Sequence, residues 1–266
     1  MRKTLSKGIL ILSLLCIIFF SCKKSSTETS SQDVVSQNAL DKILALGFSN
    51  KNVTKDEGNY VVEGDILISE SDLSNQPGSQ FLRVGSEEQY RTFNQVRVTG
   101  GQRTITVSIS SRISQFGDDL DEALNRFNAQ NLSIRFVRVP AGGEIDVVRA
   151  GGNYLASAGF PTSNGDPYGQ VKLNPNAVSG QPLSTVASIL AHEIGHCIGF
   201  RHTDYMDRSY SCGGQAVNEG SSNVGAVLIP GTPSGPDPNS WMLSCIGSGQ
   251  NRPFNANDRV ALNYLY

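Results

Sequence analysis

The sequence predicts an α+β domain built on a mixed, twisted sheet, and three observations support this class. Apolar residues alternate or recur at helical spacing in successive segments of residues 103–198, so strands and helices share one domain. Residues 203–256 are rich in Gly, Pro, Ser and Asn, which is typical of an irregular lobe. A last helix is expected after Asn257, whose side chain is a good N-cap.

Periodicity places the individual elements. Ile105 and Val107 alternate with polar residues, which indicates a half-buried strand over 103–110. Leu120 and Leu124 are four residues apart, as on the apolar face of a helix over 118–130. The other predicted elements are a helix over 39–46 ended by Gly47, strands over 60–69, 133–139, 144–148 and 169–173, and a long helix over 182–198 with Pro182 in its first turn.

The N-terminus resembles an export signal. Lys3 and Lys7 precede an apolar run over residues 8–20, which is short for a membrane span of roughly 20 residues. The run ends in Ser21 and Cys22, which resembles a bacterial lipobox, in which the cysteine is lipidated. The alternative is an ordinary signal peptide followed by a chance cysteine.

Four segments are expected along the chain: a signal peptide over 1–21, a flexible tether over 22–38, a pro-segment over 39–100 and a catalytic domain over 101–266. Lipidation would anchor the protein in the cell envelope, at the outer membrane or in the periplasm, and without it the protein would be secreted. The net charge of −2 gives no electrostatic reason to expect nucleic acid as a partner.

Cys16 lies in the export signal and Cys22 is the lipidation candidate, so three of the five cysteines remain, in an oxidising context. One disulfide and one free thiol follow from this number. Cys197 lies between apolar residues of the long helix, so it is expected to be the buried free thiol. Cys212 and Cys245 are then the predicted pair, and other pairings remain open at this point.

All three histidines of the chain lie in one short window. His192 and His196 are four residues apart and therefore share one face of the predicted helix. Zinc binds imidazole nitrogen, and catalytic zinc sites use three protein ligands and a water. Gly199 can end the helix because it tolerates positive φ, so that His202 can return as the third ligand. Glu193 is the expected general base for the zinc-bound water.

Residues 192–204 read HEIGHCIGFRHTD and fit the pattern HExxHxxGxxH. They resemble the bacterial HEIGH-type metallopeptidases, which are metzincins related to astacins, and the resemblance covers most of residues 60–266. It implies a zinc-dependent endopeptidase that acts on peptides or proteins. Ser240-Trp241-Met242-Leu243 resembles the methionine turn of metzincins, although Met242 by itself could be a core residue. Residues 254–266 resemble their final helix.

Two departures separate the chain from plain astacins. Astacin-type members carry a tyrosine shortly after the methionine, whereas Leu243, Ser244 and Cys245 follow here. The residue after the third histidine is Thr203, where astacins have a glutamate.

In metzincins the substrate lies along an edge strand upstream of the active-site helix. An extended peptide can add to such an edge through main-chain hydrogen bonds. Calcium binding at Asn164 and Asp166 is a weaker expectation. The residues expected to form the substrate edge strand are Gly169, Gln170, Val171 and Lys172.

Gly64-Asp65 resembles a pair in astacin pro-segments, whose aspartate takes the place of the water on the zinc. We expect Asp65 to keep the enzyme latent until cleavage within 83–103 removes the block. An equally good interpretation of Gly64-Asp65 is an ordinary turn in a hairpin.

Three other interpretations compete with this one. Glu219 could replace His202 as the third ligand, as in metallopeptidases that use a downstream glutamate. The chain could be a catalytically silent lipoprotein binding module on a protease fold. A zinc hydrolase that acts on a non-peptide substrate is the third.

Overall fold

The computed structural model describes residues 34–46, 48–74, 89–220, 225–233 and 235–266. The signal peptide, Cys22, most of the tether, Gly47 and part of the expected cleavage region lie outside these ranges. Asp33–Tyr266 forms one compact unit, and the pro-segment boundary at residue 100 stays a prediction. None of the helices in the described ranges is both long and apolar enough to cross a membrane.

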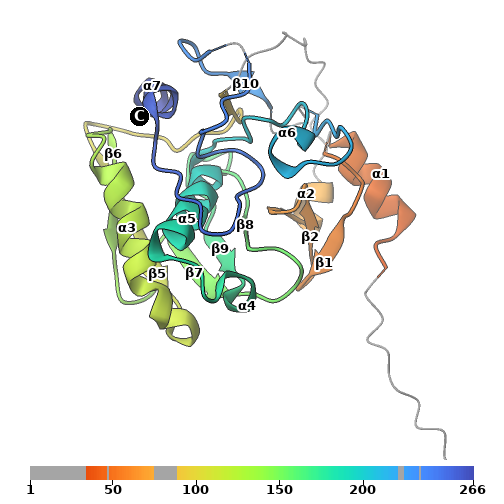
Figure 1. Ribbon diagram of the computed structural model, residues 1–266, viewed down its shortest axis with the longest axis horizontal. Coiled ribbons are helices and arrows are strands. Elements are labelled where there is room, and N and C mark those ends of the chain that lie inside the picture. The colour runs from red at the N-terminus through yellow and green to blue at the C-terminus, as the bar shows by residue number, and fades with distance from the viewer. Residues whose placement is uncertain (1–33, 47, 75–88, 221–224, 234) are drawn as a thin grey trace, which may run out of the picture. The chain divides into compact units, whose positions relative to one another are not determined.

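The predicted α+β class with a mixed sheet is confirmed. Within the described residues, one eight-stranded sheet lies at the centre of this unit (Figure 1). It is parallel between β3 and β8 and from β9 through β7 and β5 to β6, and antiparallel elsewhere. Its order is β1 (Thr54–Asp56), β2 (Asn59–Val62), β3 (Ile66–Ser69), β8 (Ala156–Ala158), β9 (Gln170–Leu173), β7 (Ile145–Arg149), β5 (Arg103–Ile109) and β6 (Ile134–Arg138).

Two helices, α3 (Gly117–Asn128) and α5 (Leu183–Ile198), lie side by side and pack on the sheet (Figure 1). Nearly all of α5 is buried, which explains why its apolar pattern extends around the helix. A small second sheet pairs β4 (Tyr90–Arg91) with β10 (Val227–Leu228). The remaining helices are α1 (Gln37–Ala45), α2 (Glu70–Ser74), the 3-10 helix η1 (Ser111–Phe116), α4 (Pro175–Val178), α6 (Ser209–Cys212) and α7 (Ala256–Leu265).

The ends of two helices decide how the chain enters the site. Gly199 follows α5 with φ of 109°, and its N–H donates to His196 O. Phe200 N donates to Gly195 O, which completes a Schellman motif. The N-cap of α7 is Asn255 rather than the predicted Asn257, because Asn255 forms a capping box with Asp258.

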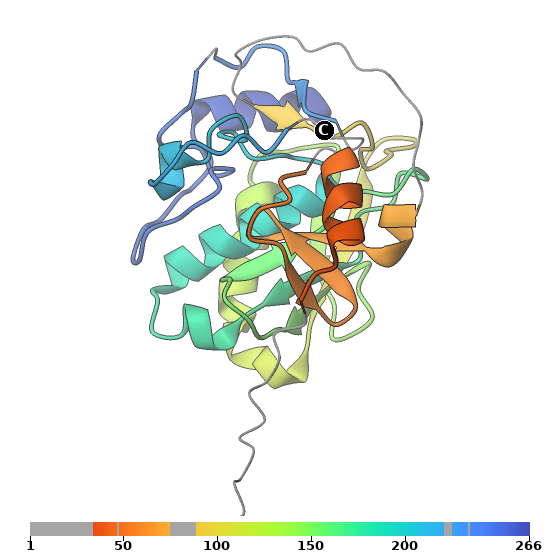
Figure 2. The same ribbon diagram turned by 90° about the vertical axis from the view of Figure 1, so that its right-hand side faces the viewer.

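The strand predicted over 60–69 is a hairpin of β2 and β3, joined by a turn at Glu63, Gly64 and Asp65. Glu63 and Gly64 have positive φ, of 56° and 96°, which no regular strand accommodates. The hairpin-turn interpretation of Gly64-Asp65 is therefore correct for the backbone (Figure 2).

The prediction that Gly169, Gln170, Val171 and Lys172 form the substrate edge strand is wrong. The strand β9, which begins at Gln170, pairs with β7 on one side and with β8 on the other, so its main-chain groups are already used. The strand β8 has no clear signal in the sequence, because Ala156-Ser157-Ala158 is short and carries no β-branched or aromatic residue.

Two separate apolar clusters stabilise the described part of the chain. The larger lies between the sheet and helices α3 and α5. The smaller holds α1 against the hairpin of β2 and β3 and consists of Ala39, Ile43, Leu46, Phe48, Tyr60, Val62, Ile66, Ile68 and Leu73.

Candidate metal centre

The three histidines meet at one point. His192 and His196 project from consecutive turns of α5, and the Schellman motif reverses the chain so that His202 faces them. The Nε2 atom of His202 lies 3.3 Å from Nε2 of His192 and 3.2 Å from Nε2 of His196. All three side chains are buried, and His196 and His202 are completely so.

The other ring nitrogen of each histidine is held by an acceptor. Nδ1 of His192 donates to the carbonyl of Trp241 at 2.9 Å, and Nδ1 of His196 donates to the carbonyl of Phe200 at 2.8 Å. Nδ1 of His202 lies 2.9 and 3.0 Å from the two carboxylate oxygens of Glu219. A proton fixed on Nδ1 leaves the lone pair of Nε2 for a metal.

The donor set fits a tetrahedral zinc ion. Bonds of roughly 2.0–2.1 Å at tetrahedral angles place ligand nitrogens about 3.3 Å apart, as the histidine nitrogens are here. The carboxylate of Asp65 completes the group, with Oδ2 3.1 Å from Nε2 of His202 and 3.5 Å from Nε2 of His192. Oδ1 of Asp65 and Oε2 of Glu193 are buried without a hydrogen-bond partner, as expected for groups that face a metal and its water.

Charges in the centre are strongly coupled. Burial opposes ionisation of Asp65, but the surrounding histidines outweigh it and hold the pKa of Asp65 well below its usual range. Burial would lower the pKa of His202, yet the carboxylates of Asp65 and Glu219 raise it well above the ordinary value. Burial lowers the pKa of His196, and the neighbouring histidines lower it further. The carboxylates of Asp65 and Glu219 therefore stabilise positive charge beside His202, and a bound divalent cation would supply that charge.

Glu193 follows His192 on α5 and is 3% exposed. Burial raises the pKa of Glu193 well above its usual range, the charge of Asp65 raises it further, and His202 opposes them. A carboxylate with a raised pKa beside the metal ligands can take up a proton and return it, which is the chemistry of a general base.

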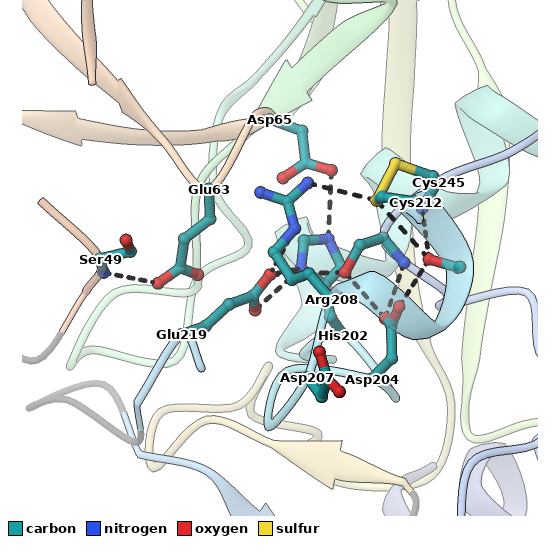
Figure 3. Close-up of polar contacts among 12 residues, drawn as sticks. Ser49, Glu63, Asp65, His202, Asp204, Asp207, Arg208, Cys212, Glu219 and Cys245 are labelled. Atoms are coloured by element: carbon teal, nitrogen blue, oxygen red, sulfur yellow. Dashed lines mark hydrogen bonds and ion pairs between the residues drawn. A yellow bond between two sulfur atoms is a disulfide. The ribbon is translucent and has the colours of Figure 1, made fainter. Parts of the chain in front are cut away.

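Glu219 lies behind His202 and contacts its Nδ1 rather than its Nε2 (Figure 3). It also forms ion pairs with Arg208, at 3.1 Å, and with Arg201, at 3.8 Å. Glu63 and Glu219 could share a cation with His202, but that group does not contain the other two histidines. The geometry therefore places Glu219 as the partner that orients His202, not as a replacement for it.

Met242 and Trp241 lie beneath α5, as the methionine-turn resemblance predicts. A Cβ atom added to Gly195 would lie 2.8 Å from Met242 Sδ and 2.5 Å from Trp241 Cη2. Thr203 N donates to Met242 O at 2.9 Å, which ties this turn to the segment that carries His202.

The hairpin covers the centre from the other side. Besides the contacts of its carboxylate, Asp65 accepts a hydrogen bond through its main-chain oxygen from Ala158 N of β8 at 2.9 Å. Ile66 pairs with Ala158 in parallel register, so β3 occupies the outer edge of β8. Glu63, with a completely buried side chain, lies 3.3 Å from Arg201 Nη2.

A cavity of about 160 Å³ opens beside His192 and Glu193. Its walls are mostly apolar, and Arg208 and Arg252 add two guanidinium groups. Its other lining residues include Gly64, Asp65, Leu155, Ile189, Trp241, Leu243, Cys245 and Ile246.

The remaining predicted residues lie outside the donor set. Cys212 and Cys245 form a disulfide, and Cys197 is a buried free thiol whose pKa is raised by burial. Asp166 forms an ion pair with Arg103 at 3.2 Å, and the expectation of calcium at Asn164 and Asp166 stays a prediction.

Three contacts of the centre have no signal in the motif. The carbonyls of Trp241 and Phe200 are backbone groups, so no residue type marks them. Glu219 stood out in the sequence only as an alternative ligand, because an isolated Asn-Glu carries no information about which ring nitrogen it approaches.

A family model described as a dual-action HEIGH metallo-peptidase matches residues 60–266. Among solved structures, the chain is similar to high choriolytic enzyme 1, a hatching-enzyme zinc protease of the medaka fish Oryzias latipes, with 18% identity, a TM-score of 0.40 and coverage of 65% of this chain and 93% of that chain. It is also similar to myroilysin, with 14% identity, a TM-score of 0.39 and coverage of 60% and 78%. A comparison with curated proteins gives no match.

Proposed function

Because the chain belongs to the HEIGH family of zinc metallopeptidases, we propose that it hydrolyses internal peptide bonds with zinc held by His192, His196 and His202 and with Glu193 as general base. The observation that carries this assignment is the convergence of three Nε2 atoms at the spacing of a tetrahedral site, each with its Nδ1 fixed by an acceptor. The histidine-rich group agrees with zinc as the cofactor.

When bound, zinc supplies a Lewis acid that polarises the scissile carbonyl and lowers the pKa of water. Glu193 accepts a proton from the attacking water and delivers it to the amide nitrogen that leaves. Burial is the first cause that raises the pKa of Glu193 and the charge of Asp65 is the second, so departure of Asp65 would lower this pKa and favour the ionised carboxylate that a general base needs. The cavity beside His192 receives a substrate side chain next to the scissile bond.

The unprocessed chain is latent in this proposal. The carboxylate of Asp65 occupies the position that the water needs, at 3.1 Å from His202 Nε2. The strand β3 occupies the edge of β8, to which an extended substrate would add. Removal of the pro-segment, residues 39 to about 100, would open both places in one event.

Export and lipid anchoring rest on the sequence of residues 1–22 alone. A lipid at Cys22 would keep the enzyme at the cell envelope through a flexible tether. Partition of the expressed protein into a detergent phase, and loss of that partition in Cys22→Ser, would support the anchor. Equal partition of both proteins would contradict it.

Hydrolysis of casein by the chain from Lys23 tests the function. We expect about one zinc per chain in the wild type and in Glu193→Ala. Activity should appear in Asp65→Ala and in processed wild type, and not in either protein when Glu193→Ala is added. Zinc without hydrolysis in every form would favour a silent binding module, and hydrolysis of esters but not of casein would favour a non-peptide substrate. Wild type without zinc would contradict the proposal.

A further inference from the structure

Lys172 is a buried cation that the proposed hydrolysis does not use. It lies on β9 with 2% of its surface exposed, although lysine is almost never fully buried unless it is paired. Its Nζ lies 2.6 Å from Asp56 Oδ2 and 3.2 Å from Glu57 Oε2. Asp56 ends β1 and Glu57 begins the turn to β2, so both carboxylates belong to the strand and turn that extend the hairpin of β2 and β3, and both precede the region matched by the family model.

A second donor reaches the same oxygen. The hydroxyl of Tyr154 donates to Asp56 Oδ2 at 2.9 Å. Burial, together with the hydrogen bond to Asp56, raises the pKa of Tyr154, so the hydroxyl keeps its proton. Ser157 stands opposite Lys172 in the register of β8 and β9. Lys172 and Tyr154, which follow the hairpin in the chain, thus supply the donors, and Asp56, in the strand that extends the hairpin, supplies the carboxylate.

The donors flank the strand at which a substrate would bind. Tyr154 directly precedes Leu155, which lines the cavity beside His192. In the same strand, β8, the main-chain N–H of Ala158 donates a hydrogen bond to the main-chain oxygen of Asp65. An extended peptide in the place of β3 would lie beside β8, which begins two residues after Tyr154 and carries Ser157 opposite Lys172.

We propose that Lys172 and Tyr154 form a carboxylate-binding subsite that selects peptides with an aspartate or glutamate, and that Asp56 occupies this subsite in the unprocessed chain. This inference rests on the proposed removal of the pro-segment. Loss of Asp56 and Glu57 takes away the carboxylates that Lys172 contacts among the described residues. A substrate carboxylate restores a charge-assisted pair, which a neutral side chain does not.

The charges around the site agree with this selectivity. The hairpin also presents Glu63 to Arg201, and Asp65 to the histidines. Arg208 and Arg252 line the cavity beside the metal centre. Removal of the hairpin would take Glu63 and Asp65 away from this region, whereas Glu219 would stay paired with Arg201 and Arg208. The region would therefore become less acidic, which favours acidic peptides.

The test uses the full chain, folded first and then cut at a site-specific protease sequence placed between residues 74 and 89. Fluorogenic peptides are compared in pairs that differ only by Asp or Asn at one position near the scissile bond. We expect one position at which kcat/KM for Asp exceeds that for Asn by about tenfold, the size of a charged hydrogen bond. This ratio should fall to about one in Lys172→Met and decrease in part in Tyr154→Phe.

Two variants serve as controls. Asp56→Asn changes only the segment that is removed, so the processed enzyme should keep the wild-type ratio. Arg135→Met removes one exposed charge from β6, at the opposite end of the sheet, and should also keep it. An Asp to Asn ratio near one at every position of the wild type, or an unchanged ratio in Lys172→Met, would overturn the subsite. If Lys172→Met does not fold, the ratio in Lys172→Arg and Tyr154→Phe decides the question.

Binding separates this inference from the proposed hydrolysis. Anisotropy of labelled Asp and Asn peptides is measured on the cut protein carrying Glu193→Ala, which needs no turnover. Tighter binding of the Asp peptide supports the subsite even if no peptide is cleaved, in which case only the proposed function fails. Equal binding of both peptides, with hydrolysis intact in the wild type, overturns the subsite alone.

Discussion

Glu219 is the residue whose role depends most on atomic detail. Its carboxylate contacts Nδ1 of His202 and the side chain of Arg208, and both partners lie within 3.1 Å. Carboxylates behind metal-binding histidines fix the ring and raise its basicity. Glu219 therefore acts on the metal through His202.

Glu219→Gln tests this role. The amide keeps one acceptor for His202 but loses the charge, so zinc affinity should decrease at least about tenfold. Competition with a chromophoric chelator measures it. The matched control is Glu122→Gln, in a partly buried ion pair with Arg126 on α3, outside the metal centre, which should leave zinc affinity unchanged. Equal affinity of Glu219→Gln and the wild type would contradict the role.

Asp258 gives a pH dependence that does not involve the metal centre. Burial raises the pKa of Asp258 from 3.8 to about 6, against the hydrogen bonds that it accepts from Asn255, Ser240, Gln89 and Trp241. The folded state thus binds the proton more tightly than the unfolded chain does. This group's contribution to stability is greatest below about pH 4 and is lost as the pH rises through about 6.

Complete loss of this contribution would lower the free energy of unfolding by about 3 kcal/mol, because the pKa of Asp258 is shifted by about 2 units. Urea unfolding at several pH values between about 4 and 7 should show a slope in the wild type that Asp258→Asn lacks. The difference in slope, rather than the absolute stability, is the readout, because the substitution also disturbs the capping box of α7. Parallel slopes would show that Asp258 does not titrate in this range.

At the scale of elements, α5 owes its position to a residue without a side chain. Gly195 faces Trp241 and Met242, and a Cβ atom there would lie 2.5 Å from the indole. Close packing of this kind holds the helix against the methionine turn. In this position the carbonyl of Trp241 accepts a hydrogen bond from Nδ1 of His192.

Gly195→Ala should reduce the free energy of unfolding by about 1–3 kcal/mol through overpacking, lessened by roughly 1 kcal/mol of improved helix propensity. Chemical denaturation measures the change. Gly151→Ala is the control, because no described atom lies within 4 Å of its added Cβ and its φ is not positive. It should change stability by about 0.5 kcal/mol at most. Equal stability of the two variants would remove the packing argument.

Elements with a strong local pattern were predictable from the sequence. The alternation of β5 and the helical spacing of α3 and α5 agree with the structure to within one or two residues at each end. The strand β8 was missed because Ala156-Ser157-Ala158 has no β-type composition, and this omission made β9 look like an edge. The cap at Asn255 was misplaced by two residues, because Asn255 and Asn257 are equally good caps in sequence.

At the scale of the whole unit, the sequence led us to expect both the grouping of the histidines and an approach of Asp65 to them, but not the pairing of β3 with β8. Residues 192–202 specify the histidine geometry because a helix and one glycine turn set it locally. The pairing of Ile66 with Ala158 joins segments far apart in the chain, and no local pattern encodes such a contact. The same holds for the contacts of Glu63 with Arg201 and of Lys172 with Asp56.

The hairpin has its own apolar cluster, and it pairs with the rest of the eight-stranded sheet through a single parallel residue pair, Ile66 with Ala158. We therefore expect buried charges to govern its release. Burial, followed by the charge of Glu219, raises the pKa of Glu63 well above its usual range, and Arg201 opposes this shift. At a pH at which Glu63 is ionised, Glu63→Gln removes the charge that faces Arg201 and should weaken binding of the fragment ending at Ser74 by about tenfold or more after cleavage. Gel filtration of the cut chain over a dilution series measures this. Asp41→Asn, on the exposed face of α1, is the control. Unchanged binding in Glu63→Gln would assign release to the apolar contacts instead.

The shortness of β8 has a consequence for the enzyme after processing. If the proposed processing removes β3, one side of β8 becomes exposed, and exposed strand edges of this kind favour edge-to-edge pairing of two molecules. With only three residues, Ala156–Ala158, it offers too few main-chain groups for a stable intermolecular sheet. In the proposed processed enzyme, the shortness of β8 would thus limit edge-to-edge pairing between two molecules while its open side receives a substrate peptide.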